Sequence, residues 1–235
     1  MDSRAHQSAA QAAIIDHDVI AARLTDDRLA SYVSAVGGDL EAAIRLYDWN
    51  VAVSSAMYAD LARLEVVFRN AVDRALGALG SARGWYQPWY QQKHLFKNQK
   101  AKKARESIAS AVDRGTPKGK SEPVHGKVIA EFTFGFWRYL CRPIFATSLW
   151  VPAVAAAFPE HPDAPDPHRV RAGVEDRVQR LHFLRNRIAH HEPIHQRDLT
   201  CDREQLLELV HWICPPCGAW VEVNSSSGGA LAARP

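Results

Sequence analysis

The chain has 235 residues, of which 47% are hydrophobic and 23% are charged, so it can fill a core and is not disordered throughout. Its 29 lysines and arginines exceed its 26 aspartates and glutamates by a net charge of only +3. A globally basic coat for nucleic acid is therefore excluded, and any basic site has to be local.

The sequence predicts a cytoplasmic protein with no membrane partner. Its four cysteines do not make a disulfide framework in a chain of this length. The first residues lack the apolar core of a signal peptide. The longest uncharged run, residues 143–159, contains three prolines and is shorter than the roughly 20 residues that span a bilayer, so we interpret it as a core segment.

Three segments are expected along the chain. Residues 1–22 are rich in alanine, glutamine and histidine, and we expect them to be flexible. Residues 223–235 combine serine, glycine and alanine and are predicted to form a flexible tail. Between them, residues 23–222 are predicted to form one all-α domain, because helix patterns dominate and no convincing run of alternating strands is present.

The first half of this domain contains two strong helix patterns. The apolar residues after Thr25 follow helical spacing until the pair Gly37–Gly38, and Asp39 is a plausible N-cap for a helix through Trp49. A second helix is predicted over residues 56–79, where apolar residues recur every three or four positions. These residues are Leu61, Leu64, Phe68, Val72, Leu76 and Leu79.

The second half begins with a basic helix over residues 98–114, followed by residues 124–140, whose aromatic run is compatible with a strand or a helix. Asp166–Pro167 is typical of a helix start, and Pro193 ends the same helix. One face of this helix carries Val170, Val174, Val178, Leu181, Leu184 and Ile188. Residues 202–213 form the last clear helix pattern.

Positive charge is concentrated in residues 93–127, which hold ten lysines and arginines and three acidic residues. Four aromatic residues, Trp85, Tyr86, Trp89 and Tyr90, come just before this segment. Cations beside aromatic rings suit RNA, whose phosphates need charge and whose unpaired bases need stacking surfaces. The candidate RNA-binding residues are Lys97, Lys100, Lys102, Lys103 and Arg105. The alternative is a solvated helix beside core aromatics.

Two motifs resemble metal sites. Residues 191–195 match the HExxH zinc motif, but Pro193 lies between His191 and His195 and should end the helix that would place both on one face. Cys214 and Cys217 form a C-x-x-C motif without a second pair or a βαβ context. We therefore predict no metal or cofactor and interpret the two cysteines as part of a helix boundary.

Two charged residues fall within apolar helix faces. Arg185 lies about 40° from Leu181 on the helical wheel, and Glu65 lies about 40° from Leu61. A buried charge is costly unless it is paired, so these two residues are predicted to form a pair, with Arg69 and Asn70 one turn further on. Such a pair is expected at a functional site, or it only fixes the register of the two helices.

Residues 185–194, Arg-Asn-Arg-Ile-Ala-His-His-Glu-Pro-Ile, resemble the R-x4-6-H signature of HEPN domains. More narrowly, they resemble the Abi-like (abortive infection) family of bacterial HEPN proteins. Residues 38–50 running on to 64–70, and residues 131–137, support this narrower match. The resemblance implies a HEPN-like helical bundle with additional helices. It also implies a metal-independent endoribonuclease, often a toxin in phage defence, with a possible cognate antitoxin.

In the family that this chain resembles, the active-site pair is the arginine and the histidine of the motif, here Arg185 and His190. RNA supplies its own nucleophile, the 2′-hydroxyl, so the protein has to move protons and stabilise charge. A neutral histidine can act as general base or acid, and Arg185 can hold a phosphate. Asn186 and His191 are expected to support this chemistry, with a 2′,3′-cyclic phosphate as product. A non-catalytic RNA-binding or regulatory protein is the alternative.

The spacing of the motif favours a homodimer. Arg185 and His190 are five positions apart, which places their side chains about 140° apart around a helix. They cannot easily reach one phosphate from a single straight helix. Either the helix unwinds before Pro193, or a second copy supplies the missing group through a two-fold interface. The HEPN resemblance also implies dimerisation around this motif.

Overall fold

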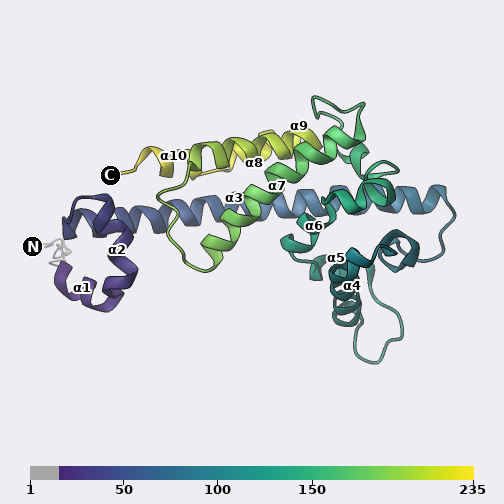
Figure 1. The fold of residues 1–235 in the computed structure, drawn as a ribbon, viewed down its shortest axis with the longest axis horizontal. Coiled ribbons are helices and arrows are strands. Elements are labelled where there is room, and N and C mark those ends of the chain that lie inside the picture. Colours follow the sequence, from purple (N-terminus) through teal and green to yellow (C-terminus); the bar gives the residue numbers. More distant parts are fainter. Residues whose placement is uncertain (1–15) are drawn as a thin grey trace, which may run out of the picture. The chain divides into compact units, whose positions relative to one another are not determined.

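The computed structural model describes residues 16–235, and these residues form helices and connecting loops with no β-strand (Figure 1). The prediction of an all-α protein is confirmed. The described residues divide into two compact units, residues 16–51 with 234–235, and residues 52–233. The predicted single domain of residues 23–222 spans parts of both units.

The first unit contains α1 (His17–Leu24), α2 (Asp26–Ala35) and the beginning of α3 (Leu40–Ala82). Residues 17–22 are therefore helical and not flexible as predicted, because the Asp16 side chain accepts a hydrogen bond from the backbone N–H of Val19 at 3.1 Å and caps α1. Residues 1–15 of the predicted flexible segment lie outside the described residues.

α3 is one continuous helix, whereas the sequence pattern predicted separate helices over 39–49 and 56–79. The linking residues 50–55 contain neither glycine nor proline, so nothing in them interrupts the helical hydrogen bonds. The start of α3 is as predicted, since the Asp39 carboxylate accepts a hydrogen bond from the N–H of Ala42 at 3.0 Å.

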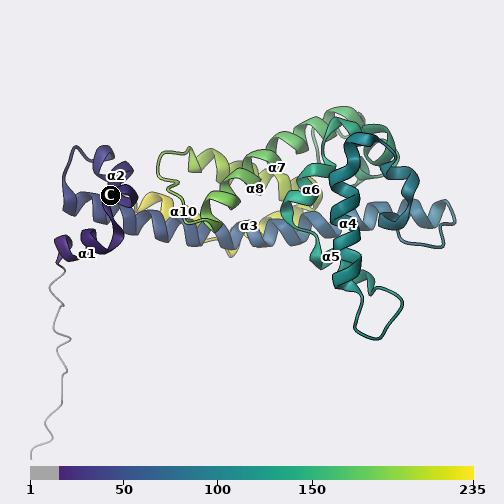
Figure 2. The same ribbon diagram turned by 60° about the horizontal axis from the view of Figure 1, so that its bottom comes forward.

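The second unit contains seven further α-helices after α3 within the described chain, drawn from another side in Figure 2. These are α4 (Lys102–Gly115), α5 (His125–Glu131), α6 (Phe134–Leu140), α7 (Pro167–Ala189), α8 (Leu199–Ile213), α9 (Pro215–Val223) and α10 (Ser227–Ala232). Short 3-10 or π turns join them at Trp89–Gln91, Lys93–Phe96, Gln99–Ala101, Pro143–Phe145, Ala146–Trp150 and Val154–Ala157. The aromatic run of residues 131–137 is helical at both ends.

The core of this unit forms around α7, which crosses α3 obliquely in both views (Figures 1 and 2). All six aliphatic residues predicted for the buried face of α7 are buried. On α3, five of the six predicted core residues are buried and Leu79 is half-buried. The ring of Phe68 contacts Phe134 of α6 and Phe158, with centroids 6.4 and 5.9 Å apart. Apolar burial thus joins α3, α6 and α7.

The C-terminal segment, residues 223–235, is not a flexible tail as predicted, because it contains α10. Hydrogen bonds hold its start in place. The Ser225 hydroxyl donates to the Asp60 carboxylate at 2.6 Å, and Arg203 Nε donates to the hydroxyl of the fully buried Ser227 at 3.1 Å. A composition typical of linkers does not reveal such long-range partners.

No helix in residues 16–235 combines the length and the apolar character needed to cross a membrane.

A buried carboxylate connects α8 to α7 and to the loop after it. Asp202 is fully buried, and its Oδ1 accepts hydrogen bonds from Arg180 Nε at 2.5 Å and Arg197 Nη2 at 3.0 Å. Its Oδ2 accepts a third from Arg197 Nε at 3.0 Å. Because Arg180 lies on α7 and Arg197 follows Pro193, this carboxylate fixes the segment that carries the end of the R-x4-H motif.

We predict that Asp202→Ala lowers the free energy of unfolding by about 3 kcal/mol, because two guanidinium groups lose a buried partner. Chemical denaturation followed by circular dichroism would measure the loss. Asp176→Ala, which removes an exposed acid from α7, is the matched control and should change stability by less than about 0.5 kcal/mol. Equal effects of the two variants would contradict the structural role of Asp202.

Candidate functional site

The start and the end of α7 are set by local signals in the sequence. Asp166 caps the first turn by accepting hydrogen bonds from the N–H groups of His168 and Arg169 at 2.9 and 3.2 Å. The helix ends at Ala189, with His190 as its C-cap. The prediction that the helix stops before Pro193 is therefore confirmed.

The end of α7 is a Schellman motif. The N–H of Glu192 donates to the carbonyl of Arg187 at 2.8 Å, and the N–H of His191 donates to that of Ile188 at 3.0 Å. His191 has a φ of 56°, in the left-handed region where glycine is usual. His191 and His195 thus lie beyond the helix and do not share one of its faces.

Arg185 and Glu65 come close to each other, as the helical wheels predicted, but they do not form the predicted ion pair. Both side chains are half-buried, and within the described residues no hydrogen bond or salt bridge joins Glu65 to Arg185 or Arg69. Burial raises the pKa of the Glu65 carboxyl from its ordinary value, and the two nearby guanidinium groups and the N–H of Phe134 oppose this rise without cancelling it.

Four cations from four helices gather near Glu65 and His182, and we call them the cation cluster. They are Arg69 of α3, Lys103 of α4, Arg138 of α6 and Arg185 of α7. In the described structure, the Nε atoms of all three arginines are buried and have no hydrogen-bond partner. Arg69 and Arg185 therefore lie near the one carboxylate, whereas Arg138, Arg185 and Lys103 lie near His182.

His182 lies among these cations and was not identified from the sequence. Burial and the charges of Arg138, Arg185 and Lys103 lower the pKa of its imidazole to about 4. The imidazole is therefore neutral at physiological pH. Asn186, one turn further along α7, places its amide nitrogen 3.4 Å from the His182 Nε2.

A signal for His182 was present in the sequence. His182 precedes Arg185 by three positions and Asn186 by four, and residues at these spacings are neighbours on a helix surface. Arg138 gave no comparable signal, and Lys103 was predicted to bind RNA but not to lie near His182, because both reach the site from other helices.

The other residues predicted for the active site lie elsewhere. His190 and His191 are exposed at the end of α7, and Asn70 is exposed on α3. In residues 16–235, no hydrogen bond links the side chains of Arg185 and His190. The structure thus brings Arg185 and Arg69 near Glu65, and among the described residues no side-chain hydrogen bond joins His190 to them.

The predicted RNA-binding residues surround the start of α4. Lys97 and Lys100 precede the helix, and Lys102, Lys103 and Arg105 lie in its first two turns. Lys103 is the member of the cation cluster that α4 supplies. Lys102 pairs weakly with Glu106 at 3.7 Å on the exposed surface.

The four aromatic residues before α4 differ in burial, and Trp85 is half-buried. Trp89 and Tyr90 are buried, and Trp89 donates a hydrogen bond to the Asp73 carboxylate at 2.7 Å. Tyr86 is fully exposed. The alternative of core aromatics beside a solvated helix is therefore correct for Trp89.

The HExxH-like residues 191–195 and the C-x-x-C motif do not combine into a metal site within the described residues. The described residues contain no group of three or more histidines, cysteines, aspartates or glutamates placed to hold a metal ion. Cys214 caps α9, because its sulfur accepts a hydrogen bond from the N–H of Cys217 at 3.3 Å. This agrees with the interpretation of the two cysteines as part of a helix boundary.

No family model, no curated protein and no solved structure matches the chain. The site is therefore interpreted from its own chemistry. Partly buried guanidinium groups without protein partners bind phosphate well, because charged hydrogen bonds strengthen where water is scarce. The cation cluster is suited to an anionic ligand such as a phosphodiester.

We predict a pH dependence of stability that is due to His182. The unfolded imidazole, with an ordinary pKa of 6.5, binds a proton as the pH falls from 6.5 to 4, whereas the folded one, with a pKa of about 4, does not. Native His182 therefore makes the protein lose stability as the pH falls through this window. His182→Gln should flatten the curve of unfolding free energy against pH there.

Two measurements check this prediction. Denaturation curves at several pH values give the slope, with His168→Gln as a control that removes an exposed histidine from the same helix. NMR titration of the His182 ring should give a pKa near 4. A His182 pKa above 6 would contradict the placement of this ring among the cations.

Proposed function

We propose that this protein is a metal-independent endoribonuclease of the HEPN type, from the abortive-infection branch, which uses Arg185 and His190. The observation that carries the proposal is the state of Arg185. Its Nε is buried without a partner, inside a cluster of positive charge, on the helix that ends in the exposed His190. A guanidinium held in this way suits the binding of an RNA phosphate.

The proposed reaction depends mainly on stabilising negative charge, which the cations of the cluster can do. When the 2′-hydroxyl of RNA attacks the adjacent phosphate, negative charge builds up on the phosphoryl oxygens. Arg185 can donate to these oxygens, and the other cations of the cluster lower the electrostatic cost further. The half-buried position strengthens these interactions relative to water.

His190 is proposed to transfer the protons. Its exposed position at the C-cap of α7 leaves its imidazole accessible to a bound nucleic acid. As general base it would remove the proton of the 2′-hydroxyl, and as general acid it would protonate the leaving 5′-oxygen. The products would be a 2′,3′-cyclic phosphate and a 5′-hydroxyl, as expected for RNA cleavage through its own nucleophile.

A second copy of the chain would complete the site. Arg185 lies among the other cations of the cluster, His190 is exposed at the helix end, and their spacing places the two side chains about 140° apart around the helix. We propose a homodimer in which Arg185 of one protomer and His190 of its partner act on the same phosphodiester. From the resemblance of residues 185–194, the proposal extends to a cytoplasmic toxin in phage defence, with a cognate antitoxin as partner.

The first test compares the cleavage of single-stranded RNA by the wild type and two variants. Arg185→Ala and His190→Ala should each lower the rate about 100-fold or more, because they remove phosphate stabilisation and proton transfer. Cleavage should persist with a chelator and should leave cyclic phosphate ends. Arg169→Ala and His168→Ala, at the exposed start of α7, are matched controls and should retain activity.

The outcomes separate the alternatives. Cleavage that stops with the chelator would contradict the proposed chemistry. RNA binding without cleavage, in all variants and in the wild type, would favour a non-catalytic RNA-binding or regulatory role.

The second test asks whether two chains share one site. Arg185→Ala and His190→Ala proteins, each inactive, should regain part of the wild-type activity when they are mixed and allowed to exchange subunits. In a random mixture, mixed dimers contain one intact composite site. A fully active protein that sedimentation shows to be a monomer at the assay concentration would contradict the shared site.

A further inference from the structure

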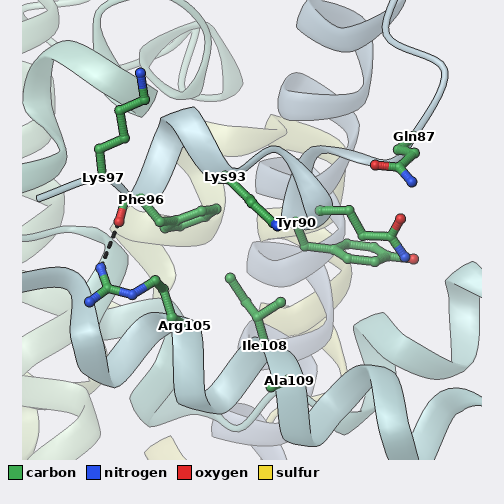
Figure 3. A pocket seen from close by; sticks show the side chains of 9 residues that line it. Gln87, Tyr90, Lys93, Phe96, Lys97, Arg105, Ile108 and Ala109 are labelled. Carbon is green, nitrogen blue, oxygen red and sulfur yellow. Dashed lines mark hydrogen bonds between the residues drawn. The ribbon is translucent and has the colours of Figure 1, made fainter.

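The second unit contains a cavity of about 570 Å³ between the turns that precede α4 and α4 itself. Figure 3 shows the rings of Tyr90 and Phe96 on one side and Ile108 of α4 on the other. All three side chains are buried, so they form an apolar floor beneath the polar lining residues. The volume lies in the range of small-molecule sites and accommodates a nucleotide.

The polar groups around the cavity select its ligand. The lining residues include Lys93, Lys97 and Arg105 and no acidic residue, so the electrostatic environment favours an anion. Figure 3 shows the Lys93 side chain reaching towards Tyr90, whereas Lys97 points away from the rings. Gln87 and Gln91 add amide groups, which both donate and accept hydrogen bonds.

Tyr90 is held in place within the wall of the cavity. Its side chain is 2% exposed, and its hydroxyl oxygen is buried and has no hydrogen-bond partner in the described structure. The ring of His125 stacks on Tyr90 at a centroid distance of 5.6 Å, which holds the tyrosine ring in place.

Arg105 holds one wall of the cavity. Its Nη1 donates hydrogen bonds to the carbonyls of Phe96 and Asn98 at 2.7 and 3.0 Å, and these tie the turn that carries Phe96 to α4 (Figure 3). Arg105 was predicted to bind RNA directly. Its contacts indicate that it positions Phe96.

We propose that this cavity binds one nucleotide unit, with the base against Tyr90 and Phe96, the amides of Gln87 and Gln91 at the base edge, and the phosphate at Lys93. Aromatic walls contact bases, amides read their edges, and a lysine neutralises the phosphate. The nucleotide is a residue of single-stranded RNA or a free nucleotide, which have the same chemistry.

The assignment of this nucleotide to an RNA strand rests on the proposed function. The position of α4 between the cavity and the cation cluster supports this assignment. Lys103 and Arg105 are two positions apart and so lie on nearly opposite sides of this helix. One side reaches the cation cluster and the other the cavity. An α-helix with its side chains is about 10–12 Å wide, so an RNA strand that crosses α4 would connect the two sites. The cavity would then hold a base near the phosphate that is cleaved.

The test uses the wild-type protein and a short 2′-O-methylated RNA that carries a photoreactive 4-thiouridine, because methylation of the 2′-hydroxyl blocks cleavage. Irradiation should crosslink the base to residues 87–97, and peptide mass spectrometry locates the crosslink. Ala109→Trp, which fills the cavity from an exposed position on α4, should abolish the crosslink and weaken RNA binding at least tenfold. Lys93→Ala should weaken binding several-fold.

The controls are matched in residue type. Ala130→Trp places the same side chain at an exposed position on α5, and Lys118→Ala removes the same charge from the loop between α4 and α5. Both should bind RNA as the wild type does.

The second arm adds nucleoside monophosphates. A crosslink from the oligonucleotide assigns the cavity to an RNA residue. Without that crosslink, saturable binding of a monophosphate that Ala109→Trp abolishes assigns it to a free nucleotide. If neither ligand binds there, the proposal is wrong, even if the protein cleaves RNA. A crosslink in a protein that never cleaves RNA would support the cavity and contradict the proposed ribonuclease.

Discussion

The burial of the aliphatic face of α7 is the constraint on which the second unit depends. Six side chains of this face, from Val170 to Ile188, are removed from water, each by an amount worth roughly 1.5–3 kcal/mol. The helix therefore cannot rotate without exposing them. Polar residues that share this face or border it, above all Arg185 and His182, are held in position by the apolar packing around them.

This packing partly buries charged groups whose loss of hydration is only partly compensated by nearby charges. Glu65 lies near Arg185 and Arg69, yet burial outweighs their attraction and raises the pKa of its carboxyl. The pKa of His182 is lowered, so its neutral form prevails. Three arginine Nε atoms stay without partners among the described residues. Such an arrangement is expected where a site is built to receive an anion rather than to stabilise the fold.

The C-terminal end of α7 and two sides of α4 carry further residues that we include in the candidate site. The Schellman motif stops α7 so that His190 and His191 project from its end, and Asp202 fixes the loop that follows. On the other side, α4 contributes Lys103 to the cation cluster and Ile108 to the nucleotide-sized cavity. In the function that we propose, an RNA strand would meet base, phosphate and proton-transfer contacts in succession.

The sequence by itself determined what depends on near neighbours: the helical class, the buried faces of α3 and α7, the Asp166 cap, and the helix end before Pro193. It also located Arg185 and Glu65 on buried faces, because helical periodicity fixes angular position. The tertiary structure decided which of these side chains meet. The cation cluster draws on α3, α4, α6 and α7, the Tyr90 cavity needs a turn folded onto α4, and α10 is held through Asp60. Local spacing holds no information on such contacts, since they arise only when distant segments pack.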